Sequence, residues 1–278
     1  MLFLLLVVTA CQPTKLAATE RITITIAGAT AMRPVLVDLT KEFSRQHPHL
    51  FFDIVGGDST MGETRVQLGQ VDLAASTLIS PTAVTTLEPS VQTKALQRIP
   101  IGLDGIVLIV HPNNPIADLS LVQTQDLYGG RIWNWQALNG SDEPVLLVVR
   151  EDGSGTRALF EERVMGETPV ALTAVVMPTS EDVVDYVAHH PTAIGYVSRA
   201  YVIDQLTQST SEPPPIRVVS LEGQLPTAET LRAQTYFLIQ PLYLVSSGQP
   251  RSWAKQFIDF ALSPAGQAIV ARYHLPIR

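Results

Sequence analysis

The stretch RITITIAGATAMRPVLVDLTKEF, residues 21–43, changes from the period of a strand to that of a helix across one short turn. Arg21 to Ala27 alternates β-branched residues and predicts a strand. Leu36, Leu39 and Phe43 lie at helical spacing, and Pro34 suits the first turn of a helix. A strand, a turn and a helix in this order predict a unit of a mainly parallel α/β architecture.

The same alternation continues along the chain. Further strands are expected at 51–55, 71–75, 105–110, 144–149, 194–197 and 236–245, and further helices at 61–68, 156–165, 180–190, around Trp253 to Phe260 and from Ser263 onward. Thr60 and Glu63 have the spacing of a capping box for the helix near 61. Ser263 and Pro264 suit the N-cap and the first position of the last helix.

Composition limits the classes of function. The chain has 278 residues, of which 46% are apolar, so a substantial core can be buried. Its formal net charge is −7, and no run of Lys or Arg is present, which argues against a nucleic-acid partner. A small anion remains possible, because a local site can oppose the overall charge.

The N-terminal segment, residues 1–20, predicts export. Leu2 to Val8 is an apolar run that is too short to span a bilayer but suits the core of a signal peptide. Val8-Thr9-Ala10-Cys11 resembles the bacterial lipobox, which implies that Cys11 carries a lipid and that Gln12 to Glu20 is a tether. A trimmed signal peptide with a chance cysteine is the alternative. The basic residues expected before the apolar run are missing, which leaves open whether translation starts upstream.

Three turns rich in glycine or hydroxyl residues each follow an expected strand and open an expected helix. They are Gly28 to Ala31, Gly56 to Gly62 and Arg150 to Arg157. The start of a helix presents free N–H groups and a partial positive charge, and several such starts at one place would bind a compact oxyanion. For each turn taken alone, a plain N-cap is the simpler interpretation.

The third turn is the most informative. We expect Arg150 to offer two parallel N–H donors to an oxyanion, and Asp152 to orient Arg150 or to accept a proton from the ligand. Ser154, Gly155 and Thr156 would add hydroxyl and amide donors. A surface Arg–Asp pair beside a capped helix is the alternative.

The chain resembles the phosphate-binding proteins of phosphate ABC transporters, from about Ile24 to the C-terminus. The matching segments are Gly28-Ala29-Thr30, Leu103-Asp104-Gly105 with Ile106 to Val110, Asp126 to Trp135, Arg150 to Thr156, Ala193 to Val197, Gln240 to Leu244, Phe257 to Phe260 and Ser263 to Gln267. So many matches in one order make chance agreement improbable.

The resemblance implies an α/β fold of the periplasmic-binding-protein type (type 2), with a ligand cleft between two lobes joined by two crossover strands. We expect lobe I at 21–104 plus 198–278 and lobe II at 105–197, with crossings near Gly105 and near Tyr196. The implied ligand-binding residues are Thr30, Ala31, Ser59, Thr60, Ser76, Thr77, Arg150, Asp152, Ser154, Gly155 and Thr156.

One position departs from the family pattern. Many members carry an aspartate directly after the serine that matches Ser76, and Thr77 stands there in this chain. That aspartate accepts the proton of hydrogen phosphate and repels sulfate, since two facing acceptors without a proton are costly when buried. Here the discrimination is either weaker or comes from another group, for which Asp104 and Asp58 are candidates.

The resemblance implies capture of inorganic phosphate for an ABC permease, without catalysis. We expect a monomer, which the lipobox at Cys11 implies is anchored by a lipid to the outer face of the bacterial cytoplasmic membrane or in the periplasm. We expect no cofactor and no metal. The alternatives are a sensor of the same fold, a binder of sulfate or molybdate, and a secreted phosphate-ester hydrolase with Ser154 as nucleophile. Neither a base nor metal-ligand spacing among the six histidines supports the hydrolase.

Overall fold

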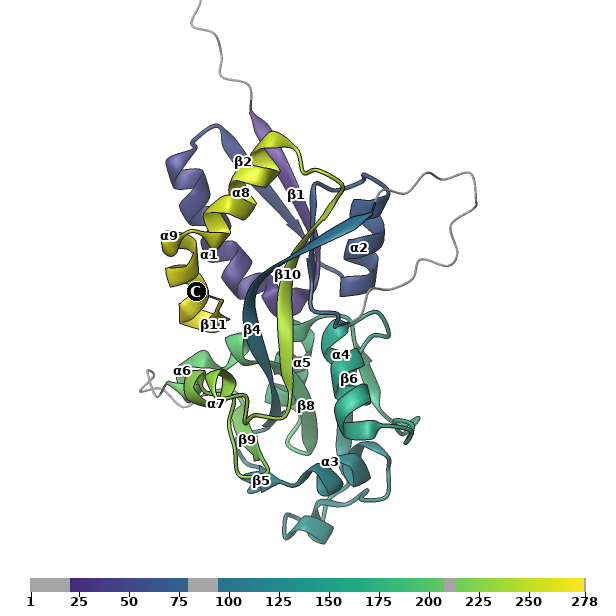
Figure 1. The fold of residues 1–278 in the computed structure, drawn as a ribbon. Helices are drawn as coiled ribbons and strands as arrows, with labels where there is room; N and C mark the ends of the chain where they lie inside the picture. The colour runs from purple at the N-terminus through teal and green to yellow at the C-terminus, as the bar shows by residue number, and fades with distance from the viewer. Residues whose placement is uncertain (1–20, 80–94, 208–213, 278) are drawn as a thin grey trace, which may run out of the picture.

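The computed structural model describes residues 21–79, 95–207 and 214–277, and the apolar run and Cys11 lie outside these residues. Two groups of helices and strands lie one above the other, and the long strands β4 and β10 run from one group into the other (Figure 1). Paired strands follow in the order β2-β1-β3-β10-β4-β8-β6-β7. The two-lobed α/β fold expected from the sequence is confirmed.

The first lobe contains the N-terminal βα units and the C-terminal helices. Its elements are β1 (Ile22–Gly28), η1 (Thr30–Met32), α1 (Arg33–Gln46), β2 (Leu50–Val55), α2 (Ser59–Gln67), β3 (Leu73–Ser76), α8 (Ser252–Leu262) and α9 (Pro264–Tyr273). Strand β1 pairs in parallel with both β2 and β3. The stretch that begins at Arg21 therefore forms the expected strand, turn and helix at the centre of this lobe.

The second lobe contains the middle of the chain. Its elements are β5 (Asp118–Leu119), α3 (Leu121–Tyr128), η2 (Trp135–Leu138), β6 (Leu146–Arg150), α4 (Gly155–Phe160), η3 (Glu161–Met165), β7 (Val175–Met177), α5 (Ser180–His189), β8 (Ala193–Ser198), η4 (Arg199–Tyr201), α6 (Ile203–Leu206), β9 (Arg217–Leu221) and α7 (Ala228–Arg232). Parallel pairs β6–β7 and β6–β8 place the start of α4 and the start of α5 at the same end of the sheet.

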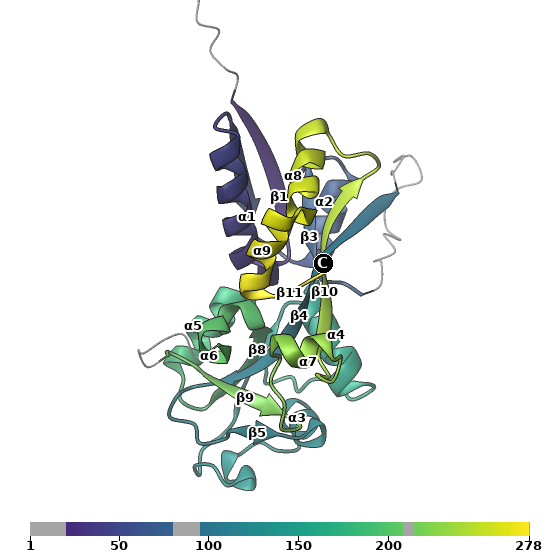
Figure 2. The same cartoon turned by 60° about the vertical axis from the view of Figure 1, so that its left-hand side comes forward.

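Two antiparallel strands connect the lobes. Strand β4 (Leu96–Val110) pairs with β10 (Ile239–Ser247) from Gly105 opposite Ile239 to Leu96 opposite Ser247. The short C-terminal strand β11 (Leu275–Pro276) adds to β4 at Leu103. Figure 2, turned by 60°, shows the same two strands passing between the lobes.

The expected lobe boundaries differ from the observed packing in one stretch. Tyr196, near which the second crossing was expected, pairs with Leu108 inside the second lobe. Strand β9 pairs with β4 and β5, and the core of the second lobe includes residues of the stretch assigned to lobe I, namely Val219, Leu221, Leu231, Tyr236 and Leu238. We therefore propose 21–104 plus 239–277 as lobe I and 105–238 as lobe II.

The caps of two helices test the sequence predictions directly. Ser263 caps α9 and accepts from the N–H of Gly266, as expected. The capping box at Thr60 is wrong, because Asp58 is the N-cap of α2 and accepts from Met61 N–H at 2.6 Å. Glu63 is buried and instead forms an ion pair with Arg98 at 2.5 Å.

Aromatic packing holds α1 and α8 against the sheet of the first lobe. The Phe43 ring is 2% exposed and lies 5.5 Å from the Phe257 ring and 5.4 Å from the Phe260 ring, measured between centroids. Phe52 of β2 contacts the same ring from the strand side. Phe43 therefore connects α1 and the following strand β2 with α8, which lies near the other end of the chain.

We predict that Phe43→Ala lowers the free energy of unfolding by about 3–5 kcal/mol, because it removes a ring at the centre of this cluster. Phe51→Ala is the matched control, since Phe51 is 44% exposed and its loss should cost much less. Urea denaturation of both variants measures the difference. Equal losses would show that the Phe43 cluster does not carry the packing of this lobe.

Candidate functional site

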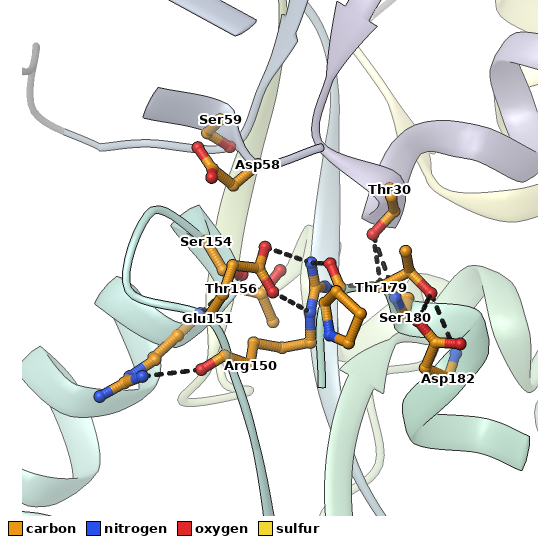
Figure 3. A network of polar contacts seen from close by, with 12 residues as sticks. Thr30, Asp58, Ser59, Arg150, Glu151, Ser154, Thr156, Thr179, Ser180 and Asp182 are labelled. Atoms are coloured by element: carbon orange, nitrogen blue, oxygen red, sulfur yellow. Dashed lines mark hydrogen bonds and ion pairs between the residues drawn. The ribbon is translucent and has the colours of Figure 1, made fainter. Parts of the chain in front are cut away.

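The three turns singled out in the sequence meet at the boundary between the lobes (Figure 3). Asp58, Ser59 and Thr30 come from the first lobe and lie across from Arg150, Ser154 and Thr156 of the second. The polar side chains of this boundary that are less than 4% exposed are Thr30, Ser59, Ser76, Thr77, Arg150, Ser154, Thr156 and Ser180. A concentration of buried polar groups needs internal partners or a ligand.

Arg150 ends β6 and lies at the centre of this group. Its Nε and Nη2 donate to the Glu151 carboxylate at 3.0 and 2.7 Å, Nη1 donates to Ser180 Oγ at 2.9 Å, and Nη2 also donates to the carbonyl of Pro178 at 3.2 Å. A guanidinium has five N–H donors, so among the described residues one N–H of Nη1 is left over. The two parallel donors expected for an oxyanion face Glu151 instead.

Asp152 does not orient Arg150, and this sequence prediction is wrong. Its side chain is 93% exposed and forms an ion pair with Arg157 at 2.6 Å. The neighbouring residue Glu151, with 23% of its side chain exposed, takes the expected position beside Arg150. The side chains of Glu151 and Asp152 point in different directions, and the sequence spacing does not show which of the two lies beside Arg150.

Thr30 joins the lobes through Ser180, the first residue of α5. The Ser180 N–H donates to Thr30 Oγ1 at 3.1 Å, and the two hydroxyls lie 3.3 Å apart. Ser180 also accepts from Arg150, so one hydroxyl connects the guanidinium to the first turn. Ala31, expected beside Thr30, is buried in η1.

Tyr201 adds a second bond across the boundary. Its hydroxyl lies 2.6 Å from the Thr30 carbonyl and 2.8 Å from the Glu181 carboxylate. Burial raises the pKa of Tyr201, and the Glu181 carboxylate raises it further, so the hydroxyl stays protonated and remains a donor. Arg33 of α1 lies 3.6 Å from Glu181 and extends this contact at the surface.

Ser59 and Thr77, both from the first lobe, form a hydrogen-bonded pair that faces Gly155 of the second lobe. Thr77 N–H donates to Ser59 Oγ at 3.1 Å, and the two hydroxyls lie 3.4 Å apart. Gly155 packs directly on Thr77, because a Cβ added to Gly155 would lie 2.8 Å from the Thr77 carbonyl carbon. Thr60 N–H reaches across the boundary to the Gly153 carbonyl at 3.3 Å.

The remaining predicted residues have local partners. Ser154 is the N-cap of α4 and accepts from Arg157 N–H at 3.3 Å. Ser76 accepts from Leu78 N–H at 3.3 Å. Thr156 donates to Gln240 Oε1 at 3.3 Å, which connects α4 to β10.

Sequence reasoning missed Glu151, Ser180, Tyr201 and Gln240. Ser180 could have been found, because it opens the expected helix at 180–190 after a short strand and Thr179 caps that helix, which repeats the pattern of the other three turns. Tyr201 and Gln240 carry no local signal, since their importance comes from strand pairing and lobe contact.

The described residues contain no group of three or more His, Cys, Asp or Glu side chains that could hold a metal ion. Within the same residues, no helix has both the length and the apolar character that crossing a bilayer requires. The hydrogen bond to the Ser154 side chain comes from Arg157 N–H, and no histidine or carboxylate base contacts this hydroxyl in the described part of the chain. The site therefore combines hydroxyls, amides and one guanidinium with the carboxylates of Glu151 and Asp58, and its N–H and O–H donors suit binding of a small polar anion.

Fold and site together define a two-lobed protein in which buried polar groups from both lobes meet beside two paired crossover strands. The model of the PBP superfamily domain matches residues 13–265, so the chain belongs to the PBP superfamily.

Several proteins similar to this chain have names that refer to phosphate binding or phosphate transport. The phosphate-binding protein PstS of Bacillus subtilis is 26% identical over 241 residues, which cover 86% of this chain and 75% of that protein. A crystal structure of a candidate phosphate ABC transporter substrate-binding protein from Clostridium perfringens, with bound phosphate, is 29% identical and has a TM-score of 0.81 over 92% of this chain and 100% of that chain. An ABC-type phosphate transport receptor from Vibrio cholerae is 25% identical, with a TM-score of 0.66 over 92% of this chain and 100% of that chain.

We predict that Gly155→Ala prevents the lobes from reaching this closed arrangement, because the new methyl would overlap the Thr77 backbone of the other lobe. Each lobe should still fold, since the overlap lies between lobes. Small-angle X-ray scattering should give a larger radius of gyration than for the unchanged protein. Gly56→Ala is the control, because its Cβ would meet nothing nearer than the Thr30 methyl at 3.9 Å. Identical scattering from both variants would contradict the lobe contact.

Proposed function

We propose that this protein binds inorganic phosphate between its lobes and delivers it to an ABC permease, without catalysing a reaction. The observation that carries the proposal is the buried Arg150 guanidinium, surrounded by hydroxyls from both lobes. Support also comes from the PstS relative and from the similar structure with bound phosphate.

The proposed ligand contacts follow from the polar groups that the site presents. The remaining Nη1 N–H of Arg150, the hydroxyls of Thr30, Ser59, Ser154 and Thr156, and the first amides of α2 and α4 would surround the phosphate oxygens. Glu151 neutralises Arg150, so a dianion would be stabilised mainly by hydrogen bonds and not by net charge. Asp152 is not part of this proposed set, because it is exposed and pairs with Arg157.

Closure of the lobes is the second part of the proposal. The bonds Thr30–Ser180, Tyr201–Thr30 and Thr60–Gly153 form only when the lobes are together. A ligand that adds bonds to both lobes favours this state, and the closed form would be the one that docks on the permease.

We further propose that the protein is a monomer anchored by a lipid at Cys11 on the outer side of the bacterial cytoplasmic membrane or in the periplasm. The support is the sequence Val8-Thr9-Ala10-Cys11 after an apolar run, and a tether of nine residues, Gln12 to Glu20, before the first strand.

We predict that Arg150→Ala weakens phosphate binding about 100-fold or more, because a charge-assisted donor and the position of Ser180 are lost together. Calorimetric titration with phosphate, sulfate and molybdate on one sample measures the change and tests the ligand class. Arg251→Ala is the control, since the Arg251 side chain is 85% exposed. Unchanged phosphate affinity in Arg150→Ala, with the fold verified by circular dichroism, would remove this site assignment.

We predict that metabolic labelling with a fatty-acid analogue in a bacterial host marks the protein and that Cys11→Ser abolishes the label. Cys11 is the single cysteine of the chain, so a thioether-linked lipid has no other attachment point. The variant should also leave the membrane fraction. A membrane-bound, labelled Cys11→Ser protein would contradict the lipid anchor.

A further inference from the structure

Behind the proposed phosphate site, a chain of buried polar side chains runs away from Thr156. Thr156 Oγ1 donates to Gln240 Oε1 at 3.3 Å, Gln240 Nε2 donates to Asp104 Oδ2 at 2.7 Å, and His274 Nδ1 lies 3.1 Å from Asp104 Oδ1. Thr156 is 2% exposed, His274 is 1% exposed, and Gln240 and Asp104 are fully buried. Gln240 and Asp104 are directly opposed on the paired strands β10 and β4.

The chemistry of Asp104 fixes the direction of every bond in this chain. An ionised carboxylate only accepts, so it selects the NH₂ side of the Gln240 amide and the protonated Nδ1 of His274. The carbonyl oxygen of Gln240 must then face Thr156. Because that oxygen cannot donate, the Thr156 hydroxyl must donate its one hydrogen to Gln240.

A hydroxyl whose hydrogen is committed in this way presents only lone pairs to the ligand. We infer that Gln240, held by Asp104, makes Thr156 an acceptor in the phosphate site, so that the protein selects oxyanions that still carry a proton. This inference rests on the proposed function. A hydrogen phosphate ion can donate to Thr156, whereas sulfate has no hydrogen and would place an oxygen against a lone pair, which is costly where water is excluded.

Two carboxylates near the site already accept hydrogen bonds from the protein. Both oxygens of Glu151 accept from Arg150, and Asp58 accepts from Met61 N–H as the cap of α2. Ser154 accepts an N–H bond, so its own hydrogen remains available for a ligand, in contrast to that of Thr156. At the position where many members of the resembling family carry an aspartate, this chain has Thr77, which supplies no carboxylate.

The test compares the ratio of sulfate Kd to phosphate Kd among variants of the full-length protein, by calorimetry under one set of conditions. Gln240→Met keeps the size of the side chain but removes the carbonyl acceptor, which frees the Thr156 hydrogen to donate to any oxyanion. The ratio should fall at least about tenfold, mainly through tighter sulfate binding, which corresponds to one buried hydrogen bond.

Gln267→Met is the matched control. Gln267 is 5% exposed, donates to the carbonyls of Ile101 and Ala261 at 3.0 and 2.9 Å, and accepts from Ile277 N–H. It loses a comparable set of buried hydrogen bonds without touching Thr156, so its ratio should stay within about twofold of the unchanged protein.

Asp104→Asn is the second variant and covers the case in which Gln240→Met does not fold. An asparagine no longer dictates the direction of the Gln240 amide, so Gln240 can turn its NH₂ group toward Thr156 and the ratio should again fall.

Two results would overturn the inference while leaving phosphate binding intact. One is an unchanged ratio in whichever of Gln240→Met and Asp104→Asn is folded. The other is a collapse of the ratio in Asp58→Asn alone, which would make Asp58 the acceptor. Absence of phosphate binding by the unchanged protein would instead refute the proposed function itself.

Discussion

The pairing of β4 with β10 determines how the two lobes can stand relative to each other. These antiparallel strands pass between the lobes, and their ladder extends from Leu96 opposite Ser247 to Gly105 opposite Ile239. Thr30 after β1, Thr77 after β3 and Arg150 at the end of β6 all lie at the boundary that this strand pair crosses. Strand β11 pairs with β4 at Leu103, next to Asp104, so the C-terminal segment packs on the same strand.

At the site beside these two strands, the charge of the one guanidinium is balanced by a neighbouring carboxylate. The chain has a formal net charge of −7, which disfavours an anion at long range. Arg150 brings one positive charge into the buried boundary, and Glu151 cancels it at 2.7 Å. What the site offers an anion is therefore a set of oriented N–H and O–H dipoles, which act at short range and depend on closure. Selectivity in such a site comes from the direction of each hydrogen and not from the sum of charges.

The local parts of this arrangement could be predicted from the sequence, and the long-range parts could not. Pro34, Ser263 and the alternation after Arg21 act within a few residues, and the corresponding strand and helices formed as expected. The partner of Arg150 was misplaced by one residue, because sequence spacing does not show which of two adjacent carboxylates is buried. The turn points the side chain of Glu151 toward Arg150 and leaves that of Asp152 exposed.

The second crossing between lobes was missed for a related reason. Its position depends on the pairing of β9 with β4 and β5, and these partners lie about a hundred residues apart in the chain. Short strands such as β5, with two residues, carry almost no periodic signal. The proposed role of Gln240 depends on the pairing of β10 with β4, which places Gln240 opposite Asp104. The residues next to Gln240 in the sequence do not indicate this pairing.

Glycine at two positions of the third turn links closure to selectivity. A Cβ on Gly153 would lie 2.5 Å from the side-chain oxygen Asp58 Oδ2, and a Cβ on Gly155 would lie 2.9 Å from the backbone atom Leu78 N. A larger side chain at Gly155 would therefore hold the lobes apart. These glycines permit the start of α4 to approach Thr77 and Leu78 closely. Where such an approach excludes water, an oxyanion oxygen that meets a lone pair instead of a hydrogen bears the full desolvation cost. In the site proposed above, the lone pairs of Thr156 can discriminate between ions of the same shape only where the lobes meet this closely.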